Sequence, residues 1–180
     1  MFKDFNISSF KKIKPPSDDT FDTMQELKEL KSIPLNKKFV KDNDDIETAF
    51  KKTAKQQGIE DYNEKIASNL IEKSAPLIIK LKKYFNRPRP KSIAKKMNIK
   101  MKDIEMDSMK TPSYPSGHSA QGMLIGSVLK DKYPKAGSAF MKTAKNISDS
   151  RKVARAHYPS DSKMGEQLGK SMYNHVKNKI

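Results

Sequence analysis

The stretch "TPSYPSGHSA", residues 111–120, combines a sharp turn with the start of an apolar helical pattern. Its prolines and Gly117 favour the turn, and the run "GMLIGSVL" that follows is typical of a buried helix face. His118, one of three histidines in the chain, lies between the turn glycine and a small hydroxyl residue. Taken alone, the stretch is equally well explained as a helix start in which Ser116 or Ser119 is the N-cap. The rest of the sequence has to decide whether His118 has a function.

Composition indicates one soluble domain. The chain has 180 residues, 35% of them hydrophobic and 32% charged, which suffices for a single buried core. No apolar run approaches the roughly 18 residues that a membrane span needs. Cysteine is absent, which excludes disulfides and thiolate metal sites. The first residues lack the apolar segment of a secretory signal, so the sequence as given predicts a soluble, cytoplasmic protein.

The charge balance predicts an anionic partner. Thirty-seven Lys and Arg residues against 21 Asp and Glu residues give a net charge of +16. Such an excess attracts nucleic acid, acidic membranes or phosphorylated small molecules. The lysines are scattered along the whole chain, whereas a nucleic-acid-binding protein usually concentrates its charge on one element. We therefore expect no nucleic acid, although charge alone does not choose among the partners.

Hydrophobic spacing predicts an all-α fold. Apolar residues recur at helical intervals and no segment alternates like a strand, so we expect a single-domain bundle of about six to seven helices, with the active site at helix ends. Residues 1–19 read as a flexible N-terminal arm and residues 20–180 as the helical domain. Gly58 is expected to end a helix and Pro76 to kink one. The predicted helices are 21–32, 43–57, 61–85, 91–97, 118–130, 136–155 and 160–177.

Three polar clusters fall at the ends of these helices. They are "KKYFNRPRP" at 82–90, the "PSGH" turn, and "SRKVARAHYPSD" at 150–161. Each is explained separately as a basic helix end or an N-cap. Together they supply two imidazoles, a carboxylate four residues from one of them, several cations, hydroxyls and a glycine amide. This set suits a tetrahedral oxyanion, whereas so many cations make a poor site for a divalent metal.

In order, the clusters resemble the signature of the type 2 phosphatidic acid phosphatase (PAP2) and vanadium haloperoxidase superfamily. That signature reads Lys-x6-Arg-Pro, Pro-Ser-Gly-His and Ser-Arg-x5-His-x3-Asp. Lys80 with Arg87 also satisfies the first part, but we prefer Lys82 with Arg89. With that choice, "KKYFNRPRP" is similar to the Lys-x-Tyr-Tyr-x-Arg-x-Arg-Pro of bacterial class A acid phosphatases. Removing Lys82 or Arg89 should then cost more activity than removing Lys80 or Arg87.

The chain departs from that subgroup at two positions near the motifs. Lys91 stands where the subgroup usually has Phe, and Pro112 where it usually has Gly. Members of the subgroup are normally exported to the periplasm, and no export signal is visible here. These departures bear on the natural substrate and the compartment, and they leave the predicted chemistry intact.

The resemblance implies a metal-independent, cofactor-free phosphomonoesterase that acts through a phosphohistidine. It makes His157 the nucleophile, Asp161 the residue that orients it, and His118 the general acid and base. The ligand would be a small phosphorylated substrate or inorganic phosphate. The implied phosphate-binding groups are Lys82, Arg89, Ser116, the Gly117 amide and Arg151, with Ser150 as a further candidate.

Two sequence observations separate the three histidines. His157 has a carboxylate four residues away, whereas His118 lacks an adjacent one, and His175 at the edge of the last helix is expected to be structural. Two alternatives stay open. One is a vanadate-dependent haloperoxidase, which usually has a much larger chain; the other is a non-catalytic basic helical protein that binds nucleic acid or anionic membrane. The sequence also leaves homo-oligomerisation open.

Overall fold

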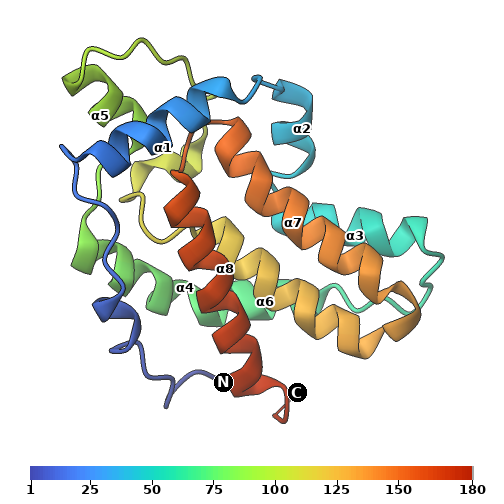
Figure 1. The fold of residues 1–180 in the computed structure, drawn as a ribbon. Helices are drawn as coiled ribbons and strands as arrows, with labels where there is room; N and C mark the ends of the chain where they lie inside the picture. Colours follow the sequence, from blue (N-terminus) through green and yellow to red (C-terminus); the bar gives the residue numbers. More distant parts are fainter. Residues whose placement is uncertain (180) are drawn as a thin grey trace.

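The regular structure of this protein is entirely helical. The computed structural model describes residues 1–179, which form eight α-helices, three short 3-10 helices and no strand (Figure 1). The prediction of an all-α, single-domain fold is therefore confirmed. The α-helices are α1 (Phe21–Ser32), α2 (Lys37–Asp42), α3 (Ile46–Gln56), α4 (Lys65–Phe85), α5 (Pro90–Lys96), α6 (Gly117–Lys132), α7 (Gly137–Val153) and α8 (Pro159–Val176). The 3-10 helices are η1 (Phe10–Lys12), η2 (Asp107–Lys110) and η3 (Pro134–Ala136).

Helix α6 is the centre of the bundle. It packs along α7 and α8 and also contacts α3 and α4 (Figure 1). Leu124, Ile125 and Leu129 on α6 are completely buried, as are Phe140 on α7 and Leu168 on α8. Burying side chains of this size contributes about 2 kcal/mol each. The apolar run that follows the "PSGH" turn thus forms the middle of the core, which fixes the turn at one end of it.

Two glycines bring α8 into backbone contact with α6. A Cβ atom at Gly165 would overlap the carbonyl oxygen of Ser116, and one at Gly169 would overlap that of Ala120. The backbone amide of Ser116 also donates to the carbonyl oxygen of Asp161 at 3.0 Å. The first turns of α6 and α8, which carry the second and third polar clusters, are consequently held side by side.

The segment predicted as one helix, 43–57, begins differently in the structure. Helix α2 precedes it, and the chain turns at residues 43–45 before α3 starts. The Asp45 carboxylate accepts from the Thr48 amide at 2.6 Å, so it is the N-cap that starts α3 there. Gly58 has φ 66° and follows the end of α3, in agreement with its predicted role. Pro76 lies inside α4, which continues on both sides of it.

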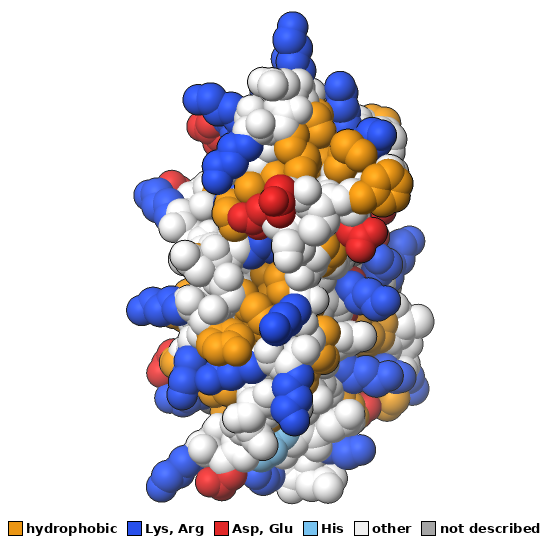
Figure 2. Space-filling view, turned by 60° about the vertical axis from the view of Figure 1, so that its left-hand side comes forward, with side chains coloured by type: hydrophobic (Ala, Val, Ile, Leu, Met, Phe, Trp, Pro, Cys, Tyr) orange, Lys and Arg blue, Asp and Glu red, His pale blue; other side chains and the backbone are white. Residues whose placement is uncertain are grey.

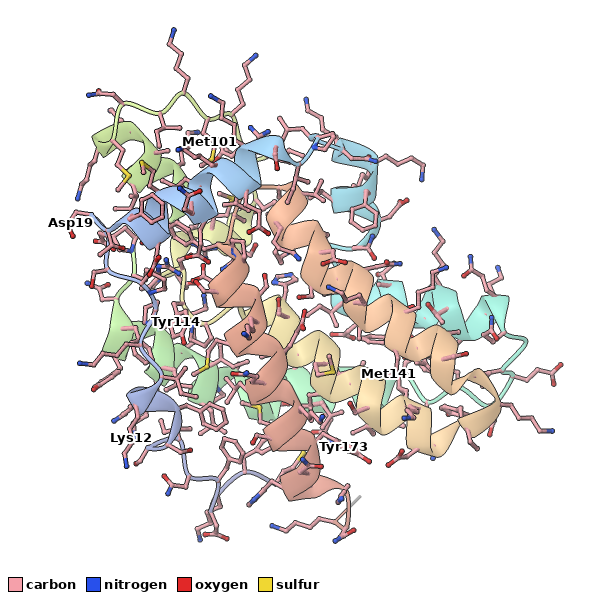
Figure 3. All side chains as sticks on the ribbon, in the orientation of Figure 1. Lys12, Asp19, Met101, Tyr114, Met141 and Tyr173 are labelled. Carbon is pink, nitrogen blue, oxygen red and sulfur yellow. The ribbon has the colours of Figure 1, made fainter. Side chains whose placement is uncertain are left out.

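The first residues of the N-terminal segment are packed against the bundle. Phe2, Ile7 and Phe10 are buried in the main core cluster. The Tyr114 hydroxyl donates to the carbonyl oxygen of Ile13 at 2.8 Å, and Figure 3 shows Tyr114 beside this segment. The domain boundary at residue 20 stays a prediction.

The surface carries its positive charge in a dispersed pattern. On the face shown in Figure 2, Lys and Arg side chains are spread from end to end, with apolar and acidic groups between them. Within the described part of the chain, no helix combines the length and the apolar character that crossing a membrane requires.

Candidate active site

The three polar clusters meet at one cavity with a volume of about 150 Å³. Ala75, Ile78 and Ile79 on α4 form an apolar wall, and Ser108, Thr111 and Gln121 add polar groups. A larger cavity, about 410 Å³, lies beside Asp131 and Tyr173 and contains none of the predicted site residues. The predicted site residues that line the smaller cavity are Lys82, Arg89, Gly117, His118 and His157.

His157 is held between a carboxylate and a guanidinium. Its Nδ1 lies 3.2 Å from Oδ2 of Asp161, and its Nε2 lies 3.0 Å from Nη1 of Arg89. Because a guanidinium only donates, Nε2 accepts and Nδ1 carries the hydrogen that Asp161 accepts. Burial lowers the pKa of His157 to about 3; the hydrogen bond to Asp161 opposes this shift, and the charges of Arg89 and Lys82 reinforce it. The imidazole is therefore neutral at pH 7, with a lone pair on Nε2.

Asp161 owes its position to the first turn of α8. Tyr158 is the N-cap, and its backbone amide donates to Oδ2 of Asp161 at 3.0 Å. The Ser113 hydroxyl donates to the same oxygen, and Nη1 of Arg87 donates to Oδ1 at 2.8 Å. Burial alone would raise the pKa of Asp161, but His157, Arg87 and Ser113 outweigh it and the pKa is lowered. The carboxylate is thus ionised and fully bonded.

The structure separates the two registers of the first motif. Lys82 is buried and donates to the carbonyl oxygen of Pro112 at 2.5 Å, and Arg89 donates from Nε to that of Thr111 at 2.9 Å. Lys80 is exposed. Arg87 does not line the cavity but forms an ion pair with Asp161 on the side of Asp161 away from His157. A substitution of Arg87 would therefore disturb the site, and it is not a neutral control for a substitution of Arg89. The sequence showed Arg87 only as an alternative register and gave no sign of this contact.

Lys82 and Arg89 line the cavity, and the negative charge near them is too small to balance their two positive charges. Burial lowers the pKa of Lys82 to about 7, Arg89 lowers it further, and Asp161 opposes the shift. Burial also lowers the pKa of Arg89 to about 10, with Asp161 opposing and Arg151 reinforcing. An anion bound between the two cations would raise both pKa values.

His118 has a neighbouring carboxylate, and the expectation that it lacks one is wrong. It follows Ser116, whose hydroxyl caps α6, and its Nε2 lies 2.9 Å from the backbone oxygen of Asp44 and 3.7 Å from Oδ1 of the same residue. Asp44 is 74 residues earlier, in the turn between α2 and α3, so local spacing could not reveal it. Burial and then Arg151 lower the pKa of His118 to about 4, while the contacts with Asp44 oppose this.

Three of the predicted phosphate-binding residues do not line the cavity. Arg151 is buried, with Nη1 donating to Oδ1 of Asp44 at 2.8 Å and Nη2 unpartnered among residues 1–179. The Ser150 hydroxyl donates to the carbonyl oxygen of Ile147 on its own helix. The Ser116 hydroxyl is engaged as the N-cap of α6. Arg151 therefore contacts the site through Asp44, the Ser116 hydroxyl caps α6, and the Ser150 hydroxyl is bonded within α7.

His175 lies apart from this cavity. Its ring packs against Phe5 and Phe2, with centroid distances of 5.5 and 6.3 Å. These contacts tie the last helix to the N-terminal segment, and they fit the structural role expected from the sequence.

The site thus combines two imidazoles and two cations around one cavity at the helix ends of an all-α bundle. Residues 66–176, more than half of the chain, match the family described as the PAP2 superfamily. The protein belongs to this superfamily.

Two curated relatives share part of the sequence. The non-specific acid phosphatase of Salmonella typhimurium (strain LT2) is 33% identical over 88 residues, which cover 49% of this chain and 35% of the relative. The non-specific acid phosphatase of Salmonella typhi is 32% identical over the same length and shares. The chain thus spans about a third of the length of these relatives in the aligned region.

Proposed function

We propose that this protein is a phosphomonoesterase that hydrolyses small soluble phosphoesters through a phosphohistidine, without a metal ion. The observation that carries the proposal is the placement of His157. Its Nε2 lone pair lies in the same cavity as Lys82, Arg89 and His118, and Asp161 fixes the opposite ring nitrogen. Membership of the PAP2 superfamily and similarity to two non-specific acid phosphatases support the same reaction class.

In the first proposed step, Nε2 of His157 attacks phosphorus and the bond to the leaving oxygen breaks. The bound phosphoester anion raises the pKa of His118 and keeps the ring protonated, so that His118 can give a proton to that oxygen. Asp161 stabilises the positive charge that develops on the His157 ring. Lys82, Arg89 and the Gly117 amide stabilise the three remaining phosphoryl oxygens, which is the main catalytic task in phosphoryl transfer. The alcohol then leaves and the phosphoryl group stays on nitrogen.

In the second step, His118 accepts a proton from water while the water oxygen attacks phosphorus. The P–N bond breaks, inorganic phosphate is released, and the His157 lone pair is restored. Arg151 supports this cycle by adding positive charge behind His118 and Asp44. The residues facing the cavity are cationic or neutral, a donor set that suits phosphate and repels a divalent metal ion.

Hydrolysis of p-nitrophenyl phosphate in excess EDTA tests the reaction class. We expect full activity in EDTA, because protein cations carry the charge stabilisation, and inhibition by vanadate, which imitates the transferred phosphoryl group. The measurement is the initial rate with EDTA, with added Mg²⁺ or Zn²⁺, and with vanadate. Activity that disappears in EDTA and returns with metal would contradict the metal-independent mechanism, and no activity under any condition would contradict the proposed function.

Anion binding should also report the lowered pKa of Lys82. Free Lys82 has a pKa of about 7, and a bound anion raises it, so binding above that pH requires proton uptake. Below the free pKa the lysine is charged in both states, and no proton is needed. We expect sulfate affinity to fall by up to about tenfold per pH unit above pH 7. Sulfate is the probe because it does not titrate in this range.

Isothermal titration calorimetry in buffers of different ionisation enthalpy measures this proton uptake directly. The matched control is Lys82→Arg, which keeps the charge and stays protonated, so its sulfate affinity should depend less on pH. The same pH dependence in wild type and Lys82→Arg would show that another group takes up the proton.

A further inference from the structure

One carboxylate of α1 reaches the rear of the candidate active site. Oε1 of Glu26 accepts from the backbone amide of Ser160 at 2.6 Å. Its Oε2 accepts from the Ser160 hydroxyl and from Nη2 of Arg87, both at 2.9 Å. Glu26 lies outside residues 66–176, the part of the chain that matches the superfamily. These contacts therefore join an element outside the matched region to the first turn of α8.

Arg87 connects the two carboxylates that flank it. Nη2 faces Glu26, while Nη1 donates to the Ser160 hydroxyl at 2.7 Å and to Oδ1 of Asp161 at 2.8 Å. The guanidinium stacks on the Tyr158 ring, 3.7 Å from its centroid, and the Arg87 side chain is 2% exposed. Its single charge is thus shared between Glu26 and Asp161 in a buried setting where solvent screens little.

Sharing this charge affects how Asp161 serves His157. With Glu26 ionised, Arg87 is held from two sides, and Oδ2 of Asp161 stays directed at Nδ1 of His157. Without the Glu26 charge, Asp161 would be the only carboxylate that balances Arg87. The Asp161 carboxylate would then shift toward Arg87, and its negative charge would concentrate on Oδ1, the oxygen that Arg87 contacts. The hydrogen bond to His157 would weaken, and the imidazole would be a poorer nucleophile.

We propose that Glu26 is a positioning residue of the phosphoryl-transfer site, acting through Arg87 and Ser160 on Asp161 and so on His157. The inference rests on the proposed function. It assigns Glu26 to nucleophile alignment and not to anion binding, because Glu26 does not line the cavity and contacts neither Lys82 nor Arg89.

The test compares two anions in the Glu26→Gln variant. Sulfate senses only the charge in the cavity, whereas vanadate accepts a fifth ligand and so also senses the His157 nitrogen. We expect sulfate affinity within about twofold of wild type. Vanadate affinity and the single-turnover rate of phosphoenzyme formation should each fall about 10- to 100-fold, the scale of a misaligned reacting group. The control is Glu29→Gln, which changes an exposed carboxylate of the same helix.

The outcomes are distinct. Unchanged vanadate affinity and unchanged phosphoenzyme formation in Glu26→Gln would overturn the inference, and so would equal losses for sulfate and vanadate, which would make Glu26 merely structural. A wild-type protein that forms no phosphoenzyme would overturn the proposed function, while the comparison of the two anions would still test the inference. If Glu26→Gln does not fold, Ser160→Ala removes one link of the same network and should show a smaller loss confined to vanadate and the phosphoenzyme.

Discussion

His157→Ala is expected to abolish hydrolysis of alkyl and aryl phosphates alike and to form no phosphoenzyme. The reason is that, within residues 1–179, only Nε2 of His157 combines a place in the cavity with a buried, ionised carboxylate on the opposite ring nitrogen, so the proposed covalent bond has no other site there. Rapid quenching with labelled substrate, followed by peptide mapping of base-stable, acid-labile phosphate, measures this directly. Label on His118 or on a serine would show that the nucleophile is assigned wrongly.

His118→Ala should instead show an effect that depends on the leaving group. A general acid matters most when the leaving oxygen is a strong base, because a good leaving group departs without a proton. We expect a greater loss on an alkyl phosphate than on p-nitrophenyl phosphate, and slower breakdown of the phosphoenzyme because water activation is impaired. Equal losses on both substrates would contradict the role of proton donor.

Lys82→Ala and Arg89→Ala should each lower kcat/KM by about 100-fold or more, the usual cost of removing an oxyanion-stabilising donor. Both side chains line the cavity. The matched control is Lys80→Ala, on the exposed side of the same helix, which should keep near wild-type activity. A loss at Lys80 as large as that at Lys82 would show that the register of the first motif is wrong.

Arg87→Ala is now expected to lower activity substantially, whereas the sequence alone predicted a smaller effect than at Arg89. Because Arg87 binds Asp161 and Glu26, its removal should lower activity by misaligning His157. Its sulfate affinity should stay close to wild type, which distinguishes it from the variants of Lys82 and Arg89.

The sequence predicted those parts of the site whose residues are close together in the chain. Lys82 and Arg89 are seven residues apart, on either side of the end of α4, and His157 and Asp161 flank the start of α8. The short spacing within each pair already indicated that its members lie close together. Long helices were predictable for the same reason, since periodicity accumulates over many residues. Helix α2 has only six residues, too few for a periodic signal to emerge.

The ion pairs behind the cavity could not be predicted from the sequence, because they join residues that are far apart in the chain. Asp44 meets Arg151 across 107 residues, and Glu26 meets Arg87 across 61. In sequence, both acids look like ordinary charges on the surface of a helical protein. The burial of Phe2, Ile7 and Phe10 could not be predicted for a similar reason: they are interspersed with charged residues, and only tertiary packing decides that they are covered.

Because the backbones of α6 and α8 are in contact, the packing of these two helices determines how far apart the two sides of the site lie. Gly165 touches the N-cap of α6, and it follows Asp161 by one helical turn. His118 and His157 lie at the starts of the two helices that this contact holds together, and in the proposed mechanism they act on opposite sides of one phosphorus atom. A methyl group at position 165 would overlap the Ser116 carbonyl oxygen and push the two helices apart. It would thereby increase the distance between the proposed proton donor and the proposed nucleophile without contacting either one. The distance between the two imidazoles is thus set by Gly165, a residue that has no side chain.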